Sequence, residues 1–394
     1  MASTLPPPDV DAQSHSAHLR EVIQEQLSAA GGHLPFWKFM ELALYAPGLG
    51  YYSAGARKFG PGGDFTTAPE RSPLFSACVA DALTPVLQQL GPDAVCMEIG
   101  GGSGAFAETC LAKLLANDAL PARYAILEPS ADLRERQRER LGRSLIPPVF
   151  ELVEWLDGPP EEKWNGVLFA NEVIDALPTP RFTLREGEVF EEHVALDGEG
   201  RFVRMERPAD ALLAASVRHV ERYLESPFVD GYRSELLPQL PYWLQAVMGG
   251  LQAGAMLFVD YGYPRREYYL PDRDGGTLRA FYRHRVHNDA YLWPGLQDLT
   301  ASVDFTALAE AGTQASFELE GYCTQAGFLL GNGLQDRLVE AEQRADEALL
   351  MRLRNEARQL TLPTGMGERF QVMGFSRDVE FAAAFLSDDL TWRL

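Results

Sequence analysis

Short apolar runs alternate with amphipathic stretches through the middle of the chain. The runs predict strands at residues 95–99, 124–127, 149–153, 166–170 and 255–259. The last two are nearly all apolar, as expected for strands buried on both faces. The stretches between them carry apolar positions at helical spacing, for example at 105–115 and 131–141. Strands that alternate with helices predict a parallel sheet with right-handed crossovers. We therefore expect an α/β fold with a Rossmann-like, mostly parallel sheet.

The remaining patterns divide the chain into segments around this core. Residues 180–207 alternate apolar and polar positions between glycine-bearing turns, which predicts a small antiparallel insert. Residues 333–359 predict one long charged helix. In chain order we expect a disordered arm at 1–17, a helical region with a long structured loop at 18–90, the Rossmann-like core at 91–260 with an insert at about 180–250, a lid or substrate loop at 261–300, and the completion of the core with a helical insert at 301–394.

The composition bears mainly on the choice of partner. The 394 residues are 46% hydrophobic and 23% charged, which is ordinary for a globular protein with a sizeable core. The formal net charge of −21 at pH 7 repels phosphate backbones. We therefore expect no nucleic-acid partner. The same charge suits a basic partner, such as a protein segment that bears arginine.

The cysteines and the apolar runs predict a protein of the bacterial cytoplasm. Cysteines at 78, 96, 110 and 323 include no pair at CxxC spacing, so we expect reduced, buried thiols and no metal site. The longest apolar runs are too short to cross a bilayer. The N-terminal residues contain no apolar signal region. The basic residues are almost all arginine, which suggests a bacterial genome of high GC content.

A glycine-rich loop follows the first strand of the predicted core and opens a helix. It is Glu98-Ile99-Gly100-Gly101-Gly102-Ser103-Gly104. Glycines allow a sharp turn and let a ligand approach the backbone without a Cβ in the way. A dinucleotide or S-adenosylmethionine would fit such a loop. The acid Glu98 favours the methyl donor, because a carboxylate there can orient the loop or meet the donor's ammonium, whereas it would repel a pyrophosphate.

A second carboxylate ends the next predicted strand. Glu128 follows residues 124–127, and an acid in this position accepts hydrogen bonds from the two hydroxyls of a ribose. A solvated surface acid is the alternative. Both candidate ligands contain ribose, so Glu128 does not choose between them. With Glu98, it predicts S-adenosyl-L-methionine as cofactor and S-adenosyl-L-homocysteine as product.

Three polar residues follow the fourth predicted strand, in the segment Asn171-Glu172-Val173-Ile174-Asp175. Ligands of open α/β sheets bind at the carboxyl ends of the strands. Asn171, Glu172 and Asp175 would form an acidic pocket there, in which a carboxylate holds a guanidinium by paired hydrogen bonds. We predict them as the catalytic residues of a methyl transfer, a reaction in which orientation supplies much of the rate. For Asp175 the alternative is a cap of the following turn.

Motifs spread from about residue 20 to 375 resemble the MidA-like family. In order they are Gly50-Tyr51-Tyr52, Gly63 to Glu70, Glu98 to Gly104, Asn171 to Pro178, Gly276 to Arg279 with Tyr282 and His284, Val303-Asp304-Phe305, and Met366-Gly367-Glu368. This family of S-adenosylmethionine-dependent methyltransferases includes a mitochondrial complex I assembly factor that methylates protein arginine. The resemblance implies a Class I fold with a mostly parallel seven-stranded sheet, an N-terminal helical extension and inserted elements. The family loop usually has proline where Gly101 stands.

The resemblance also implies a role for the loop that ends at Glu70. Asp64, Phe65 and the Thr66-Thr67 pair are expected to close over the amino-acid end of the donor, with Phe65 excluding water. An ordinary turn is the alternative, because Gly-Asp and Thr-Thr often form one.

The last candidates concern the methyl acceptor. Tyr52, His284 and Asp304 are expected to line a substrate channel, although a lone histidine is often a structural hydrogen-bonding group. The predicted function is a protein arginine N-methyltransferase that acts on a protein with an exposed arginine, such as a respiratory complex I subunit or its bacterial counterpart. A small-molecule methyltransferase and a non-catalytic assembly factor that binds the donor are the alternatives, and an NAD-dependent reductase is the weakest. The oligomeric state stays open, with a homodimer among the possibilities.

Overall fold

The computed structural model describes residues 5–54, 67–344 and 346–394. The chain forms two compact units, each assembled from three stretches. Unit 1 comprises residues 1–65, 174–239 and 263–304, and unit 2 comprises residues 66–173, 240–262 and 305–394. The predicted segments follow the chain order and do not coincide with these units, because the chain passes from one unit to the other several times.

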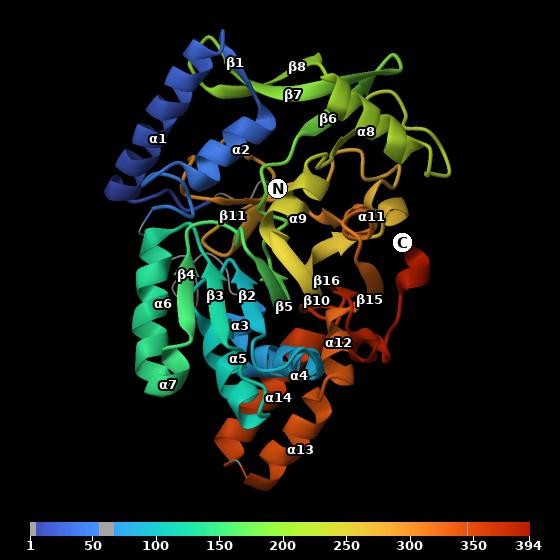
Figure 1. Ribbon diagram of the computed structural model, residues 1–394. Helices are drawn as coiled ribbons and strands as arrows, with labels where there is room; N and C mark the ends of the chain where they lie inside the picture. The colour runs from blue at the N-terminus through green and yellow to red at the C-terminus, as the bar shows by residue number, and fades with distance from the viewer. Residues whose placement is uncertain (1–4, 55–66, 345) are drawn as a thin grey trace. The chain divides into compact units, whose positions relative to one another are not determined.

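Unit 2 is built on a mixed β-sheet. Its strands follow the order β15 (Glu318–Thr324), β16 (Phe370–Arg377), β10 (Gly250–Tyr263), β5 (Lys163–Asn171), β2 (Val95–Ile99), β3 (Arg123–Leu127) and β4 (Val153–Leu156) (Figure 1). From β10 to β4 neighbouring strands are parallel, whereas β16 is antiparallel to β10 and to β15. The predicted α/β class is confirmed. The sheet is mixed, because β16 lies between β15 and β10 and runs in the opposite direction.

The strand order reverses beside β2. From β2 the chain builds outward through β3 and β4, and then adds β5 and β10 on the other side of β2. In open α/β sheets such a reversal marks a ligand crevice at the carboxyl ends of the strands. Because β2 and β5 pair in register up to Ile99 and Ala170, the glycine loop and Asn171 follow adjacent strand ends.

Helices cover the sheet because its strands are apolar on both faces. One buried cluster joins the strands to several helices, among them α4 (Pro73–Leu90), α5 (Ala105–Ala116), α12 (Gln325–Gly331) and α14 (Glu347–Thr361). In β10, Leu257 and Val259 belong to this cluster, while Phe258 faces the other side and packs against Phe375. The other helical elements of unit 2 are α3 (Ala68–Arg71), α6 (Ala131–Ser144), α7 (Pro147–Phe150), α9 (Leu240–Met248), α11 (Phe305–Gln314), α13 (Leu334–Arg344), η1 (Ala382–Phe385) and η2 (Thr391–Arg393).

Two predicted elements of unit 2 differ from those observed. The strand predicted at 149–153 begins only at Val153, because the two prolines at 147 and 148 open the helical turn α7. The single helix predicted at 333–359 is wrong. It is two helices, α13 and α14, and the second begins where the Asp346 side chain accepts a hydrogen bond from the Leu349 N–H at 2.7 Å.

The described residues of unit 1 form two antiparallel sheets. The larger follows the order β1 (His33–Pro35), β7 (Glu188–Leu196), β6 (Arg181–Arg185) and β9 (Arg233–Glu235), with β8 (Phe202–Pro208) also paired to β7. The smaller follows the order β12 (Arg285–His287), β11 (Arg279–Tyr282) and β13 (Asp298–Thr300). The antiparallel insert predicted at 180–207 is thus confirmed. The segment 261–300, expected as a lid or loop, contains the smaller sheet and α10 (Arg265–Tyr268), and β14 (Val303–Asp304) follows it.

Unit 1 also contains α1 (Val10–Ala29), α2 (Phe36–Tyr45) and α8 (Ala211–Glu221). The start of α1 corrects the prediction of a disordered arm over 1–17, because residues 10–17 are helical. Asp9 caps this helix by accepting a hydrogen bond from the Ala12 N–H at 2.9 Å. The buried side chains Leu19, Ile23 and Leu27 on one face of the helix join the core of the unit.

Three further observations concern membrane-spanning helices, cysteines and metal sites. In residues 5–54, 67–344 and 346–394, no helix has both the length and the apolar character needed to span a bilayer. The four cysteines are buried and free. Within the same ranges, no group of three or more His, Cys, Asp or Glu side chains is arranged to hold a metal ion.

The close approach of β5 to β2 predicts a large effect of a single methyl group. A Cβ at Gly166 would collide with the Val95 carbonyl. We therefore expect Gly166→Ala to lower the free energy of unfolding by about 3 kcal/mol in urea denaturation. Gly158→Ala is the control, because a Cβ there meets nothing within 4 Å, and it should change stability by less than about 0.5 kcal/mol. Equal stabilities of the two variants would contradict this account of the sheet.

Candidate functional site

The glycine loop leaves β2 through backbone conformations that favour glycine. Gly100, Gly102 and Gly104 have φ angles of 70°, 52° and 82°. The Gly100 N–H donates to the Leu127 carbonyl at 3.0 Å, and the Gly104 N–H donates to the Gly101 carbonyl at 2.8 Å. The loop is therefore tied to the end of β3 at its start, and it enters α5 through Gly104.

Gly101 is required by packing and not by its backbone conformation. Its φ lies outside the left-handed region, but a Cβ would stand 2.8 Å from Cγ2 of Ile126 and 3.0 Å from Nε2 of Gln137. A proline would meet these same two side chains. The departure from the usual family proline thus goes together with a close approach of Gln137 to the loop.

Gln137 connects the loop to the carboxylate after β3. Its Nε2 donates to the Gly102 carbonyl at 2.8 Å and lies 3.3 Å from Oε2 of Glu128. Its Oε1 accepts a hydrogen bond from Nε1 of Trp155 at 2.8 Å. Gln137 was not among the residues predicted from the sequence. The available signal was its position in α6, where it shares the buried face with Leu133.

Glu128 is buried, so the alternative of a solvated acid is wrong. Its Oε1 accepts a hydrogen bond from the Ser130 N–H at 3.0 Å. Burial raises the pKa of Glu128 to about 6, although the hydrogen bonds from Ser130 and Gln137 oppose the rise. A partly satisfied carboxylate at the end of β3 is a ready acceptor for the hydroxyl groups of a ligand.

Glu98 is buried at the end of β2 and is held by the neighbouring strand. The Tyr124 hydroxyl donates to its Oε2 at 2.8 Å. Burial raises the pKa of Glu98 to about 7; the hydrogen bond from Tyr124 opposes the rise, and the charge of Glu128 adds to it. Of the two roles considered for Glu98, orienting the loop is the one for which this contact provides an anchor. Tyr124 itself was missed, because it lies inside an apolar run.

Glu172 has a backbone conformation that is rare for a residue with a side chain. Its φ is 54°, and its N–H donates to the Val259 carbonyl at 2.9 Å. Such strained residues cluster at functional sites. The carboxylate is held from two sides, since Nδ2 of Asn171 donates to Oε1 at 3.1 Å and the Tyr261 hydroxyl donates to Oε2 at 3.0 Å. Burial raises the pKa of Glu172 to about 7, against these two hydrogen bonds and a third from the Ala68 N–H.

Two residues near the end of β10, Asp260 and Tyr261, belong to the site but were not predicted from the sequence. Asp260 is buried, and its carboxylate accepts hydrogen bonds from the Tyr261 N–H at 2.8 Å and the Val173 N–H at 3.3 Å. It thereby holds the backbone just beyond Glu172. The signal was present, because both residues follow the apolar run 255–259 in the same way that Asn171 follows the run 166–170.

Four predicted site residues lie in unit 1. Asp175 is buried there. The Tyr52 hydroxyl donates to Oδ1 of Asp298 at 3.0 Å. Asp304 accepts a hydrogen bond from Nε of Arg265 at 3.2 Å in a largely buried ion pair. His284 is exposed in the turn between β11 and β12, with a φ of 60°. Their predicted roles in catalysis and acceptor binding stay predictions.

The loop expected to close over the donor is described only at its end. Thr67 precedes α3, and its side chain makes no capping hydrogen bond to that helix. Asp64, Phe65 and Thr66 lie outside the described residues, so their roles stay predictions.

The groups gathered in unit 2 fit a cationic nucleoside ligand. The loop glycines leave its backbone free of Cβ atoms, and three carboxylates (Glu98, Glu128 and Glu172) stand at the ends of the neighbouring strands β2, β3 and β5. The buried Oδ1 of Asn171 accepts no hydrogen bond within the described part of the chain, so an acceptor is available for a ligand there. The sulfonium and ammonium of S-adenosylmethionine are cations, and its ribose supplies two hydroxyl donors.

Comparison with known proteins agrees with this chemistry. Residues 78–323 match the family described as "Putative S-adenosyl-L-methionine-dependent methyltransferase". A crystal structure of a protein from Burkholderia thailandensis bound to S-adenosyl-homocysteine is similar, with a TM-score of 0.92 and 40% identity over 99% of this chain and 100% of that chain. Protein arginine methyltransferase NDUFAF7, mitochondrial, is 28% identical in Danio rerio, over 87% of this chain and 83% of that protein. In Homo sapiens it is 26% identical, over 86% and 79%.

The chain belongs to this family of S-adenosyl-L-methionine-dependent methyltransferases, and S-adenosyl-L-methionine is its cofactor. The resemblance to the MidA-like family, stated from the motifs, is confirmed. The fold is accordingly the α/β fold of a methyltransferase with a mixed sheet.

The loop geometry predicts how product binding responds to substitution. Gly102→Val should abolish S-adenosyl-homocysteine binding in calorimetry, because a β-branched residue is strained at a φ of 52°. Glu128→Gln should weaken binding about tenfold, since hydrogen bonds to a charged acceptor are stronger than those to a neutral one. The exposed Glu151→Gln is the control and should leave the affinity unchanged. Unaltered binding by Gly102→Val would show that the donor site lies elsewhere.

The raised pKa of Glu98 predicts a loss of stability as the pH rises. A carboxyl with a pKa of about 7 when folded and near its ordinary value of 4.5 when unfolded binds more protons in the folded state between these values. The free energy of unfolding should therefore fall over this range, by up to about 3 kcal/mol for this group. Urea denaturation at several pH values measures the slope. Glu98→Gln keeps an acceptor for Tyr124 and should flatten the slope relative to Glu151→Gln, and identical slopes in the two variants would refute this contribution.

Proposed function

We propose that this methyltransferase transfers the methyl group to an arginine side chain of a protein substrate. The observation that carries the proposal is the Glu172 carboxylate, held by Asn171 and Tyr261 at the strand end next to the glycine loop. The relatives named protein arginine methyltransferases, at 26–28% identity in Danio rerio and Homo sapiens, support it. A subunit of the bacterial counterpart of respiratory complex I is the target that the family resemblance suggests.

Glu172 performs two tasks in this proposal. Its carboxylate accepts hydrogen bonds from Asn171, from Tyr261 and from the Ala68 N–H. A carboxylate can accept about four hydrogen bonds, so acceptor capacity remains for the guanidinium of the substrate. Paired hydrogen bonds fix the direction of the attacking nitrogen and hold positive charge on the other nitrogens. As the N–C bond forms and the C–S bond breaks, the excess proton leaves the attacking nitrogen for a carboxylate whose pKa, about 7, suits a base at neutral pH.

The remaining residues of unit 2 bind the donor, which supplies the methyl group as an electrophile. Glu128 accepts hydrogen bonds from the ribose hydroxyls, and Glu98 orients the loop through its contact with Tyr124. Within the same proposal, the mixed sheet is a Class I, Rossmann-like core, and Asp64, Phe65, Thr66 and Thr67 cover the donor. The acceptor contacts come from Tyr52, Asp175, His284 and Asp304.

Replacing Glu172 tests the proposal directly. Glu172→Gln should lower kcat for an arginine peptide about 100-fold, because it removes the base and the charged partner of the guanidinium. Affinity for S-adenosyl-homocysteine should stay within about twofold, since the substitution leaves the glycine loop intact. The exposed Glu161→Gln is the matched control and should keep full activity. Labelled donor followed by amino-acid analysis identifies the product, and label found only on lysine or on small molecules would exclude the arginine assignment.

The pH profile of the same reaction gives a second test. The carboxylate form of Glu172 is the active form, and its pKa is about 7. The rate should therefore rise about tenfold per pH unit below 7 and level off above it. Glu172→Gln should lose this rise, whereas Glu161→Gln should retain it. A rate that does not depend on pH in the parent enzyme would rule out Glu172 as the base.

A further inference from the structure

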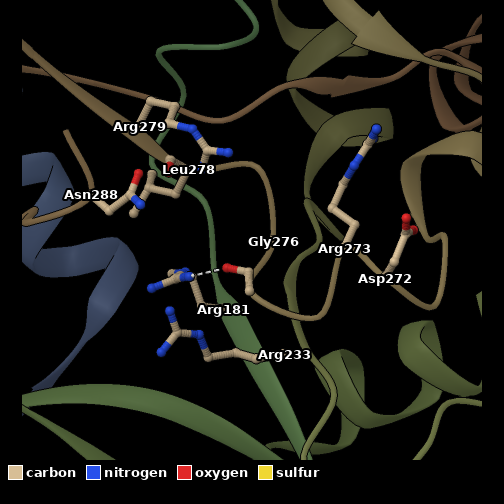
Figure 2. A pocket seen from close by; sticks show the side chains of 9 residues that line it. Arg181, Arg233, Asp272, Arg273, Gly276, Leu278, Arg279 and Asn288 are labelled. Carbon is tan, nitrogen blue, oxygen red and sulfur yellow. Dashed lines mark hydrogen bonds between the residues drawn. The ribbon is translucent and has the colours of Figure 1, made fainter. Parts of the chain in front are cut away.

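A basic pocket of about 290 Å³ lies in unit 1, and its lining includes none of the residues assigned to donor binding and methyl transfer. Its lining includes four arginines, Arg181, Arg233, Arg273 and Arg279, together with Asn288 and Asp272 (Figure 2). Such a concentration of guanidinium groups is notable in a chain with a formal net charge of −21. Like charges placed together are unfavourable unless an anion compensates for them.

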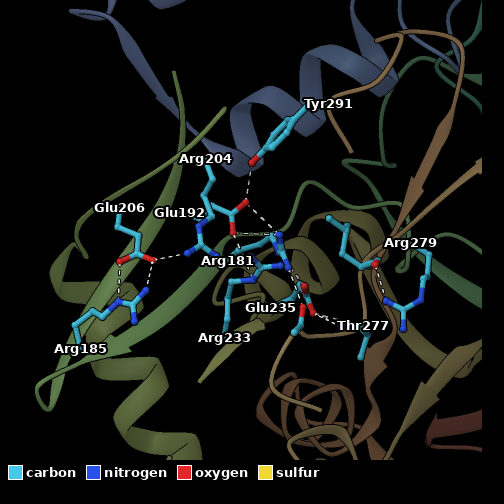
Figure 3. A network of polar contacts seen from close by, with 12 residues as sticks. Arg181, Arg185, Glu192, Arg204, Glu206, Arg233, Glu235, Thr277, Arg279 and Tyr291 are labelled. Atoms are coloured by element: carbon cyan, nitrogen blue, oxygen red, sulfur yellow. Dashed lines mark hydrogen bonds and ion pairs between the residues drawn. The ribbon is translucent and has the colours of Figure 1, made fainter. Parts of the chain in front are cut away.

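Arg181 is compensated by the protein itself. Its Nε donates to Oε1 of Glu235 at 2.9 Å, and its Nη1 lies 3.1 Å from both oxygens of Glu192 (Figure 3). Its Nη2 donates to the Gly275 carbonyl at 3.0 Å. All three charged side chains are buried. This ion-pair network forms a rigid wall of the pocket. Because Glu192 and Glu235 are both paired with Arg181, they do little to neutralise the other arginines.

The same network holds the segment that carries Arg279. The Thr277 N–H donates to Oε2 of Glu235 at 2.6 Å. Gly276 has a φ of 79°, and a Cβ there would collide with the Glu235 carboxylate. The backbone before Arg279 is therefore pressed against a buried ion pair and has little freedom to move. A position fixed in this way is suited to recognition, because little conformational entropy is lost on binding.

The other three arginines are not compensated to the same degree. The nearest carboxylate oxygen to Arg233 is that of Glu192 at 3.9 Å, and its buried Nε has no hydrogen-bond acceptor among the described residues. Burial lowers the pKa of Arg233, and the charge of Arg181 adds to this effect. Arg273 stacks 4.0 Å from the ring centroid of Tyr263, and its buried Nη1 likewise has no acceptor in the described ranges. Arg279 donates to the Leu278 carbonyl at 2.8 Å.

The direction of these donors distinguishes between anions. Figure 2 shows Arg181 and Arg233 on one side of the pocket and Arg279 and Asn288 on the opposite side. A planar carboxylate pairs with a single guanidinium fork, whereas the tetrahedral oxygens of a phosphate can accept hydrogen bonds from several directions. The lining also includes an acid, Asp272. Its side chain is exposed, so water and salt screen its repulsion of a bound anion.

We propose that this pocket binds a phosphate group, either as inorganic phosphate or as the monoester of a small molecule. Arg233 and Arg279 supply the principal hydrogen bonds, Asn288 donates its amide, and Arg181 holds the wall in place. The volume exceeds that of a phosphate ion, which leaves room for the group that an ester carries. This binding is separate from the proposed arginine methylation and is measured without donor or acceptor.

Calorimetry on the full chain at low salt, with inorganic phosphate, O-phosphoserine and acetate as ligands, tests the proposal. Phosphate or phosphoserine should bind saturably, and Arg233→Gln and Arg279→Gln should each weaken binding at least about tenfold. Arg279→Lys keeps the charge but loses the fork and should have an intermediate effect. Arg266→Gln is the control, because this exposed side chain lies outside the pocket and should leave binding unchanged. Thermal melting identifies any variant that fails to fold.

The three ligands separate the outcomes. Tighter binding of phosphoserine than of inorganic phosphate supports a monoester, and the reverse order supports the free ion. Acetate that binds as tightly as phosphate would overturn the assignment in favour of a carboxylate. The proposal also fails if neither phosphate ligand binds, or if folded Arg279→Gln and Arg279→Lys bind as tightly as the parent protein.

Discussion

The functional half of this structure depends on the burial of carboxylates at the ends of neighbouring strands. Glu98, Glu128 and Glu172 stand after or at the end of β2, β3 and β5, where water cannot fully solvate them. A buried charge is costly unless hydrogen-bond donors replace the lost water. Each carboxylate accordingly has donors from the protein, and these donors fix where the loops that follow the strands can lie.

The hydrogen bonds do not fully offset the cost of burying these three carboxylates, and the pKa of each group is raised as a result. Hydrogen bonds from Tyr124, Ser130 and Tyr261 lower the pKa of their respective carboxyl groups, but burial outweighs them in each case. The three groups therefore gain most from a ligand that brings further donors or positive charge. S-adenosyl-L-methionine brings both, and in the proposed reaction the guanidinium of the acceptor brings both to Glu172.

In unit 1, buried carboxylates are paired with a buried arginine and not with neutral hydrogen-bond donors alone. Arg181 forms ion pairs with both Glu192 and Glu235. The charges of these three buried side chains are therefore balanced largely by one another. Removing one member of such a buried group leaves an unpaired charge, which typically costs about 3–5 kcal/mol. The position of this ion-pair network explains why residue 276 is a glycine, because a Cβ there would collide with the Glu235 carboxylate.

The sequence by itself determined the features that depend on residues near one another in the chain. Apolar runs identified the strands at 95–99, 166–170 and 255–259, and glycine spacing identified the loop after the first of them. The helical periodicity at 333–359 wrongly predicted a single helix. The Asp346 side chain caps the start of a second helix there and divides the segment into two helices.

Only the tertiary structure decided which side chains complete the site. Tyr124 reaches Glu98 across 26 positions, Gln137 reaches Gly102 across 35, and Tyr261 reaches Glu172 across 89. No local pattern encodes such pairs, because they form only when parallel strands bring distant segments to the same edge of the sheet. The basic pocket has the same origin, since Arg181, Arg233 and Arg279 start or flank three separate strands. The sequence therefore specified the chemistry that was available, and packing selected the groups that act together.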